Sequence, residues 1–266
     1  MAETGSLRFA ATRLQAAGNE VLDEIVAEEV AVALVYNGIS HAVMMATPCD
    51  LEDFARGFSL SERIVDKPSE IFDIDVEPVG RGIEVRLEIS GQRLASLQER
   101  RRSLAGRTGC GLCGVESLAE ALRPVQSVTH PGKVSAAAVR RAMADLPAQQ
   151  RINKLNGATH AAGWATADGV LIAVREDVGR HNALDKLLGA LAKTDEVRTG
   201  GFVVVTSRCS YEMVQKAAAG GAWAIAAVSA PTSLAIETAR QAGLALIAFV
   251  RGDRMTVYAH GDRMVP

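Results

Sequence analysis

The second half of the chain alternates short apolar segments with helical ones, and this alternation limits the possible folds more than any other feature. The predicted strands cover residues 170–174, 202–206, 223–228, 244–250 and 255–259, and the predicted helices cover residues 181–193, 210–219 and 232–242. Strands that are apolar along their whole length are typical of a sheet covered on both faces. The pattern therefore predicts an α/β domain, a layered sheet with flanking helices.

The first part of the chain predicts a smaller α+β region. Residues 29–36 and 39–46 are rich in β-forming residues and flank Asn37-Gly38, which is the strongest short-range hairpin signal. Residues 71–89 predict two more strands, and helices are predicted at residues 48–59 and 92–104. Antiparallel pairs with a few helices are typical of an α+β region.

These patterns divide the chain into three parts. Residues 1–27 carry little pattern and are expected to be disordered in part. The N-terminal α+β region is expected at residues 28–123, where it ends in a glycine-rich loop, and the α/β domain at residues 124–266. Two helices, at about residues 115–122 and 134–145, are expected around the boundary, and Pro147 is expected to end the second.

Composition excludes several classes of protein. Lys and Arg total 29 against 31 Asp and Glu, a formal net charge of −2, so the chain lacks the basic excess of a general nucleic-acid binder. Four cysteines are too few for a disulfide-stapled secreted scaffold. Residues 217–236 carry no charge, but glycines and a proline interrupt them, so no membrane span is expected. A cytoplasmic protein with reduced thiols is the expectation.

Two of the cysteines form a CxxC pair, Cys110 and Cys113, within the glycine-rich segment TGCGLCG at residues 108–114. The glycines leave both sulfurs open to approach. The thiolate is the reactive form, and nearby positive charge lowers the pKa of a cysteine. Four arginines lie within ten residues upstream, at positions 100, 101, 102 and 107. The pair is therefore the first candidate for chemistry.

The spacing of the two cysteines does not discriminate between three interpretations of the pair. CxxC resembles half of a zinc site, but the chain has no second CxxC, and Cys49 and Cys209 would have to converge from distant segments. Dithiol redox chemistry is the second interpretation. The third is sulfur relay, in which one thiolate holds a sulfane sulfur as a persulfide and its neighbour stabilises or releases it. A deaminase-type zinc site is excluded, because no P-C-x-x-C motif is present.

Four polar loops follow predicted strands, at residues 175–182, 207–210, 229–233 and 249–254. Ligands of open α/β sheets bind beyond the carboxyl ends of the strands. Helix N-termini and the guanidinium groups of Arg180, Arg208, Arg251 and Arg254 suit phosphate, and Asp253 suits the N–H edge of guanine. Each loop taken singly also fits an ordinary cap or hairpin turn. His181 lies in the densest polar loop, whereas His41, His130, His160 and His260 have no partner visible in the sequence.

Four long motifs resemble the formate dehydrogenase accessory sulfurtransferase family. They are TGCGLCG at residues 108–114, EDVGRHNALDK at 176–186, SRCSYEMVQK at 207–216 and FVRGDRMTVY at 249–258. The resemblance runs from about residue 28 to about residue 264 and is far more specific than CxxC alone. It implies a larger domain similar to the cytidine deaminase fold without its zinc site. Cys49 and Cys209 receive no role from it.

The resemblance also implies a function. Members of the family carry sulfur from a cysteine desulfurase to the molybdenum cofactor, bis(molybdopterin guanine dinucleotide), before the cofactor enters the catalytic subunit of formate dehydrogenase. Cys110 matches the cysteine that bears the persulfide, and Cys113 assists it. The cofactor-binding stretch matches Phe249, Val250, Arg251, Gly252, Asp253 and Arg254. The resemblance implies a homodimer without a metal site of its own, and the composition above predicts no nucleic-acid or membrane partner.

The main alternative is a cofactor-binding chaperone with a structural metal at Cys110 and Cys113. A thiol oxidoreductase is a third hypothesis, and it requires a dithiol–disulfide couple that does not depend on a sulfur donor.

Overall fold

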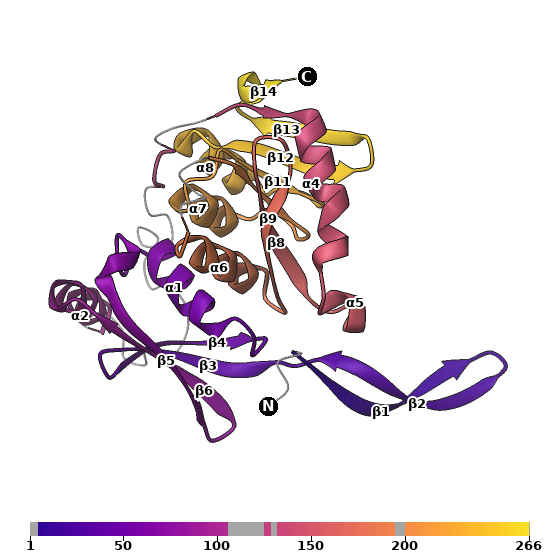
Figure 1. The fold of residues 1–266 in the computed structure, drawn as a ribbon, viewed down its shortest axis with the longest axis horizontal. Helices are drawn as coiled ribbons and strands as arrows, with labels where there is room; N and C mark the ends of the chain where they lie inside the picture. The colour runs from indigo at the N-terminus through magenta and orange to yellow at the C-terminus, as the bar shows by residue number, and fades with distance from the viewer. Residues whose placement is uncertain (1–4, 106–124, 129–131, 195–199, 266) are drawn as a thin grey trace.

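The computed structural model describes residues 5–105, 125–128, 132–194 and 200–265. The protein is a mixed α/β protein, and its largest sheet has six strands in the order β13-β12-β11-β10-β8-β9 (Figure 1). The strands are β8 (His160–Ala165), β9 (Leu171–Asp177), β10 (Phe202–Val205), β11 (Ala224–Ala227), β12 (Ala245–Arg251) and β13 (Arg254–Ala259). All five strands predicted in the second half of the chain are confirmed.

The strand directions place four carboxyl ends at one edge of the sheet. β10, β11 and β12 are parallel. β8 is antiparallel to both β10 and β9, so β9 points the same way as the three parallel strands. β13 returns antiparallel to β12. The loops that follow β9, β10, β11 and β12 therefore leave the sheet at a common edge.

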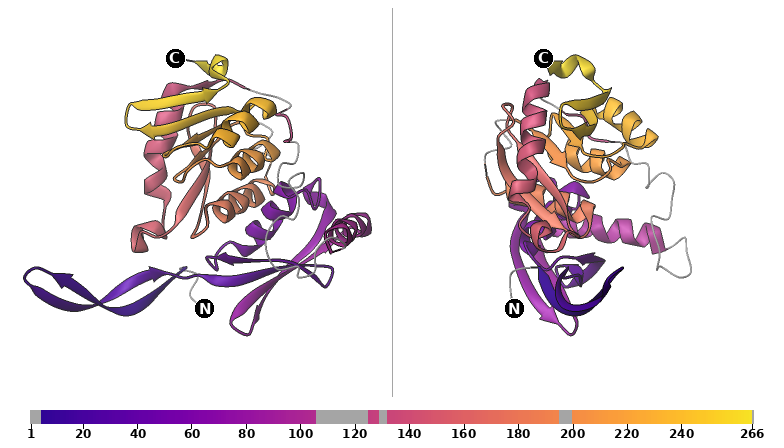
Figure 2. Two further views of the ribbon diagram at one scale, coloured as in Figure 1. Left: turned by 180° about the vertical axis from the view of Figure 1, so that it is seen from behind. Right: turned by 90° about the vertical axis from the view of Figure 1, so that its right-hand side faces the viewer.

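Helices cover both faces of this sheet, which explains why its central strands β10 and β11 are apolar throughout. Val203 and Val205 of β10 pack in one buried cluster with the helices α6, α7 and α8. Phe202 and Val204 of the same strand pack in the other cluster with α4. Figure 2 shows α4 on one side of the sheet and the other three helices opposite. The helices are α4 (Ala136–Gln149), α6 (Arg180–Leu191), α7 (Tyr211–Ala219) and α8 (Ser233–Ala242).

The N-terminal region holds a second sheet of four strands in the order β4-β3-β6-β5. Its elements are β3 (Val30–Tyr36), β4 (Ile39–Ala46), α1 (Leu51–Ser61), the short η1 (Pro68–Glu70), β5 (Ile71–Val79), β6 (Gly82–Ile89) and α2 (Gly91–Ala105). The predicted hairpin at Asn37-Gly38 is confirmed, with Tyr36 paired to Ile39. A separate apolar core under α1 holds this sheet together.

Helix α1 joins this region to the large sheet by packing against α6 (Figure 1). The two helices approach closely because each has a glycine at the crossing. A Cβ atom at Gly57 would collide with the backbone oxygen of Asp185, and one at Gly189 would collide with that of Asp53. Contact of this kind between backbones fixes the position of α1 on the large sheet.

The sequence pattern does not predict the two strands within residues 6–27. β1 (Ser6–Gln15) and β2 (Gly18–Ala27) form an antiparallel hairpin that extends beyond the rest of the molecule (Figures 1 and 2). The segment escaped detection because its strands carry charged and apolar residues without clean alternation, and most of their side chains are exposed.

Smaller differences concern strand β8, helix α4 and the chain ends. Strand β8 was not predicted, because its alanines and glycine carry a weak strand signal. Pro147 lies inside α4, which continues to Gln149. The short elements are α5 (Asn153–Asn156), η3 (Gly261–Arg263), and β7 (Val134–Ser135), which pairs with β14 (Met264–Val265). The helix predicted at residues 115–122 lies outside the described residues. Within the described ranges, no helix is long and apolar enough to span a bilayer.

Candidate functional site

The four polar loops predicted as a ligand site lie together at the carboxyl edge of β9, β10, β11 and β12, called the edge below. Backbone hydrogen bonds connect adjacent loops. Cys209 N–H donates to the carbonyl of Ala230 at 3.1 Å, which ties the loop after β10 to the loop after β11. Phe249 N–H donates to the carbonyl of Ser229 at 3.3 Å, which ties the latter to the end of β12. The edge is a single connected surface.

The predicted cofactor-binding stretch, residues 249–254, forms the turn between β12 and β13. Phe249, Arg251, Gly252, Asp253 and Arg254 are exposed. Val250 is 2% exposed, so a ligand at this turn would meet Val250 through its backbone. Arg251 Nε donates to the carbonyl of Val228 at 3.2 Å, which leaves the rest of its guanidinium at the surface.

Phe249 has a backbone conformation that few aromatic residues adopt. Its φ angle is 52°, in the left-handed region, and the pairing of β12 with β13 shifts register between Ala248 and Arg251. Bulges of this kind redirect side chains and are common beside functional sites. Here the bulge leaves Phe249 40% exposed at the edge.

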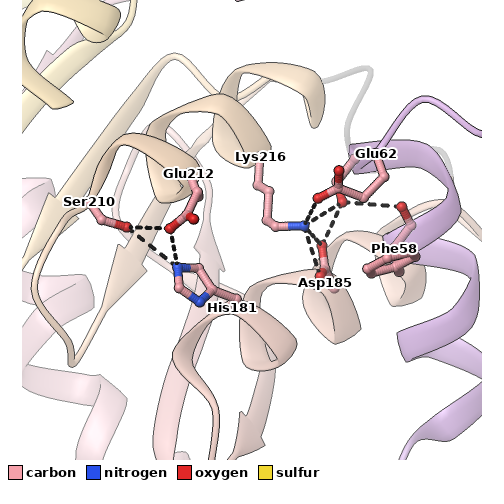
Figure 3. Close-up of polar contacts among 8 residues, drawn as sticks. Phe58, Glu62, His181, Asp185, Ser210, Glu212 and Lys216 are labelled. Atoms are coloured by element: carbon pink, nitrogen blue, oxygen red, sulfur yellow. Dashed lines mark hydrogen bonds and ion pairs between the residues drawn. The ribbon is translucent and has the colours of Figure 1, made fainter. Parts of the chain in front are cut away.

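The loop after β9 brings His181 and Arg180 to the same edge. His181 Nε2 lies 2.9 Å from Glu212 Oε2 and 3.4 Å from Ser210 Oγ (Figure 3). The hydrogen bond from His181 is the main cause that lowers the pKa of Glu212. Arg180 Nε is buried and has no hydrogen-bond partner among the described residues. Buried donors without a partner are rare, and this one lies in the first residue of α6.

His160 belongs to this group, although the sequence gave no sign of it. It opens β8 and pairs with Asp177 at the end of β9. Burial is the main cause that lowers the pKa of His160, and the charge of Arg180 lowers it further. Predicting β8 would have placed His160 beside the loop after β9.

The motif at residues 176–186 also contains groups that are structural. Asp177 and Lys186 form an ion pair of 2.7 Å with both side chains 0% exposed. Lys186 Nζ also donates to the carbonyl of Thr47 at 2.9 Å, and Thr47 N–H donates to Asp177 Oδ2 at 3.0 Å. These bonds join the N-terminal region to the large sheet.

A second buried ion pair lies between α1, α6 and α7 (Figure 3). Lys216 Nζ is 3.0 Å from Asp185 Oδ1 and 2.9 Å from Glu62 Oε1. Burial opposes the positive charge, but the two carboxylates outweigh it and raise the pKa of Lys216. Lys216 is therefore held as a cation that fastens α1 to α6 and α7.

The two described cysteines are poor nucleophiles. Cys209 is 0% exposed, and burial raises its pKa to about 12. Cys49 is partly buried, and burial is the main cause that raises its pKa. Cys110 and Cys113 lie outside the described residues. Among the described residues, no three His, Cys, Asp or Glu side chains gather in a way that would hold a metal ion.

An open cleft of about 1140 Å³ separates α5 and β9 from the N-terminal region. Two of its cations pair with Asp53: Arg175 Nη2 is 2.8 Å from Asp53 Oδ2, and Lys193 Nζ is 2.6 Å from Asp53 Oδ1. Because these two cations are paired, the cleft is a weaker candidate for an anionic ligand than the edge.

The fold and the edge define a mixed α/β protein with an arginine-bearing surface at the carboxyl ends of its strands. The sequence profile of the FdhD/NarQ family matches residues 27–265, so the chain belongs to that family. A protein of Cupriavidus necator described as sulfur carrier protein FdhD is 54% identical over 96% of this chain and 89% of its own length. One of Bordetella petrii with the same description is 53% identical over 90% of this chain and 86% of its own length.

A solved structure is similar to the whole fold. The crystal structure of a Desulfotalea psychrophila protein matches with a TM-score of 0.74 and 24% identity, over 98% of this chain and 99% of the other. At this identity the match bears on the fold alone.

Proposed function

We propose that the protein is a sulfur carrier for formate dehydrogenase, with Cys110 as the residue that holds the sulfur. The family match over residues 27–265 and the relatives described as sulfur carrier proteins support this function most directly. The CxxC pair supplies the thiol chemistry that such a carrier needs.

The burial and raised pKa of Cys49 and Cys209 favour the CxxC pair as the sulfur acceptor. A sulfur acceptor must ionise and must be reached by the donor. Cys209 meets neither requirement, because it is fully buried and its pKa is raised to about 12. Burial also raises the pKa of Cys49. Cys110 and Cys113 are therefore better candidates for sulfur transfer than Cys49 and Cys209.

The first transfer is an exchange that leaves the total number of electrons unchanged. The thiolate of Cys110 attacks the terminal sulfur of the persulfide on a cysteine desulfurase. The bond between the two donor sulfurs breaks, the desulfurase cysteine leaves as a thiolate, and Cys110 becomes a persulfide.

The second transfer delivers that sulfur to the molybdenum cofactor. The thiolate of Cys113 attacks the inner sulfur of the Cys110 persulfide, and the terminal sulfur leaves as hydrosulfide, which becomes a ligand of the metal. Cys110 and Cys113 are left as a disulfide, which a cellular dithiol must reduce before the next cycle.

The edge is the proposed binding site for the substrate of that transfer, bis(molybdopterin guanine dinucleotide) with its molybdenum. Arginine forks suit phosphate, and Arg251 and Arg254 are exposed at the turn of residues 249–254. Helix α6 begins at Arg180, and no described side chain caps it, so its free N–H groups favour an anion. The Nε of Arg180, which has no hydrogen-bond partner among the described residues, adds one more donor. Similarity of this domain to the cytidine deaminase fold stays a prediction.

The proposed partners are a cysteine desulfurase as donor and the catalytic subunit of formate dehydrogenase as the protein that receives the loaded cofactor. We also propose that the protein is cytoplasmic and acts as a homodimer. The formal net charge of −2 gives no support for a nucleic-acid partner.

Intact mass after incubation with a desulfurase and cysteine tests the role of Cys110. The wild type is expected to gain sulfur that a reductant removes, and Cys110→Ala is expected to stay unmodified while remaining folded. Cys209→Ala is the control and should gain sulfur like the wild type. Full loading of Cys110→Ala would overturn the proposal, and so would one zinc ion per chain that blocks both thiols of the pair.

A further inference from the structure

The hairpin of β1 and β2, called the arm below (residues 6–27), packs on the described part of its own chain only near its root, where β2 contacts α5. The strands pair along their full length, from Ser6 with Ala27 to Gln15 with Gly18, and they form a separate two-stranded sheet. The root is fastened to the body, because Asn156 Nδ2 donates to Ser6 Oγ at 2.9 Å. From there the arm extends away from the body (Figures 1 and 2).

Both faces of the arm carry exposed apolar side chains. Since side chains alternate along a strand, the pairing places Phe9 and Val26 on one face and Leu14 and Val21 on the other. Leu14 is 75% exposed and Val21 is 80% exposed. A lone two-stranded hairpin is marginally stable in water at best. An arm of this length and composition therefore needs a surface that covers it.

The cleft between α5 and the N-terminal region is the matching surface. It is open, about 1140 Å³ in volume, and lined in part by apolar side chains. Among them, Leu155 of α5 and Ile172 of β9 are exposed. α5 also contacts β2, so the cleft lies beside the root of the arm. The arm extends beyond the body in its own chain (Figures 1 and 2), and no arm residue lines this cleft. In a dimer with two-fold symmetry, each cleft would receive the arm of the other copy.

The size of the contact favours a second copy over an unrelated partner. Strand rise and spacing make each face of the arm about 33 Å long and about 10 Å wide, or about 330 Å². A single contact between arm and cleft would bury about 660 Å² in total, well below the roughly 1,200 Å² at which specific interfaces begin. Two reciprocal contacts reach about 1,300 Å², and two-fold symmetry supplies the second contact without any new surface.

We propose that the arm is a dimerisation element that packs into the cleft of a second copy of this chain, which returns the same contact. The inference rests on the proposed homodimer, for which it assigns the interface, and it is independent of sulfur transfer. The most exposed large apolar residues of the arm, Leu14 and Val21, meet the partner, and Leu155 and Ile172 receive them.

Light scattering on the purified full-length protein tests this inference. The wild type is expected to have the mass of two chains, and Leu14→Glu with Val21→Glu is expected to have the mass of one chain at the same concentration. Ile172→Glu tests the cleft side and is expected to give single chains as well. Phe72→Glu is the matched control, because Phe72 is 69% exposed on β5 and lies outside both the arm and the cleft; it should leave the dimer intact.

Each contrary result overturns a stated part of the inference. A wild type with the mass of one chain, or a dimer that survives both arm substitutions, overturns the role of the arm. A dimer that survives Ile172→Glu overturns the assignment of the cleft. Sulfur loading of the arm variant, measured by intact mass, separates the two proposals: a single chain that still loads sulfur leaves the sulfur-carrier function standing.

Discussion

The edge and the junction between the N-terminal region and the large sheet draw on the same sequence motifs but use them in opposite ways. At the junction, Asp177 pairs with Lys186 with both side chains 0% exposed. At the edge, Arg208 and Arg251 are exposed. Charges at the junction are satisfied within the chain, whereas much of the charge at the edge faces outward. Paired burial is typical of a structural role, and exposed cations in one place are typical of an anion site.

Helix α6 shows how one segment serves both regions. Its first turn, Arg180 and His181, lies at the edge. Positions three to four residues apart share a helix face, and Asn182, Asp185 and Lys186 are buried on the face toward the N-terminal region. A binding surface and the joint that holds two regions together therefore lie within seven consecutive residues. Substitutions in this motif will affect either stability or binding, according to the face that they alter.

The largest effect is expected from Asp177→Ala at the junction. This change leaves the ammonium of Lys186 buried without its partner. Removal of one member of a buried pair costs about 3–5 kcal/mol. The free energy of unfolding in urea should fall by that amount. Addition of Lys186→Met should recover part of the loss, because an apolar replacement of both partners removes the buried charge.

Asp145→Ala is the matched control for the junction. Asp145 is exposed on α4, and its Oδ2 lies 4.0 Å from Arg141 Nε, so its loss should cost less than about 1 kcal/mol. If Asp177→Ala were as mild as Asp145→Ala, the junction would not differ from the surface, and the comparison would fail.

Most of the large sheet could be predicted because its local and tertiary signals agree. β10 and β11 are continuous apolar runs, and helix α8 begins at the predicted cap, where Thr232 Oγ1 accepts from Ala235 N–H at 3.2 Å. β8 could not be predicted in this way. Its residues are mostly alanine and glycine, and they form a strand because β9 and β10 pair with them on either side. The pairing that makes β8 a strand is a tertiary contact, which the local sequence does not encode.

The candidate site also depends in part on sequence order and in part on tertiary packing. Parallel strands place their following loops at one edge, so the convergence of the four loops followed from the order of elements. The sequence did not reveal which charges in those loops are buried. Lys216 and Arg208 lie in one motif, but Lys216 is buried against Asp185 and Arg208 is exposed. Burial of Lys216 depends on α1, which packs there because of the close contact at Gly57. Cys110 and Cys113 lie outside the described residues, so their roles stay predictions.

A smaller effect is expected from Arg251→Ala with Arg254→Ala at the edge. Both side chains are exposed, so the free energy of unfolding should change by less than about 0.5 kcal/mol. Affinity for guanosine diphosphate, used as a probe for half of the proposed dinucleotide, should fall, because each charge-assisted hydrogen bond contributes about 1.5–3 kcal/mol. Isothermal calorimetry measures the binding, and urea unfolding measures the stability.

Arg81→Ala in the turn between β5 and β6 is the control for this loss of charge. Arg81 is exposed and far along the chain from the four loops of the edge, so its removal should leave the affinity for guanosine diphosphate unchanged. Equal losses in the two variants would mean that the probe responds to net charge, and the edge would lose its status as a site. If the double variant lost more stability than expected, Arg251 or Arg254 would have a structural role like that of the junction charges.

The smallest effect is expected at Glu212, which shares one property with the junction and one with the edge. It is paired with His181, as the junction charges are paired, yet its side chain is 57% exposed, as those of the edge are. The hydrogen bond from His181 lowers the pKa of Glu212 below its ordinary value of 4.5. A carboxyl whose pKa is lowered on folding stabilises the fold above its unfolded pKa, and this contribution is lost as the pH falls through the folded pKa.

Glu212→Gln should therefore cost stability near pH 6, and the cost should shrink as the pH falls below about 4. Exposure and screening limit it to less than about 1 kcal/mol. Unfolding in urea at both pH values measures the difference, with the exposed Glu237→Gln on α8 as control. A cost that is larger and the same at both pH values would mean that Glu212 acts through packing, as a junction residue does. A cost that disappears at low pH would mean that the pair is held by charge at an open surface, and Glu212 and His181 would then belong to the edge.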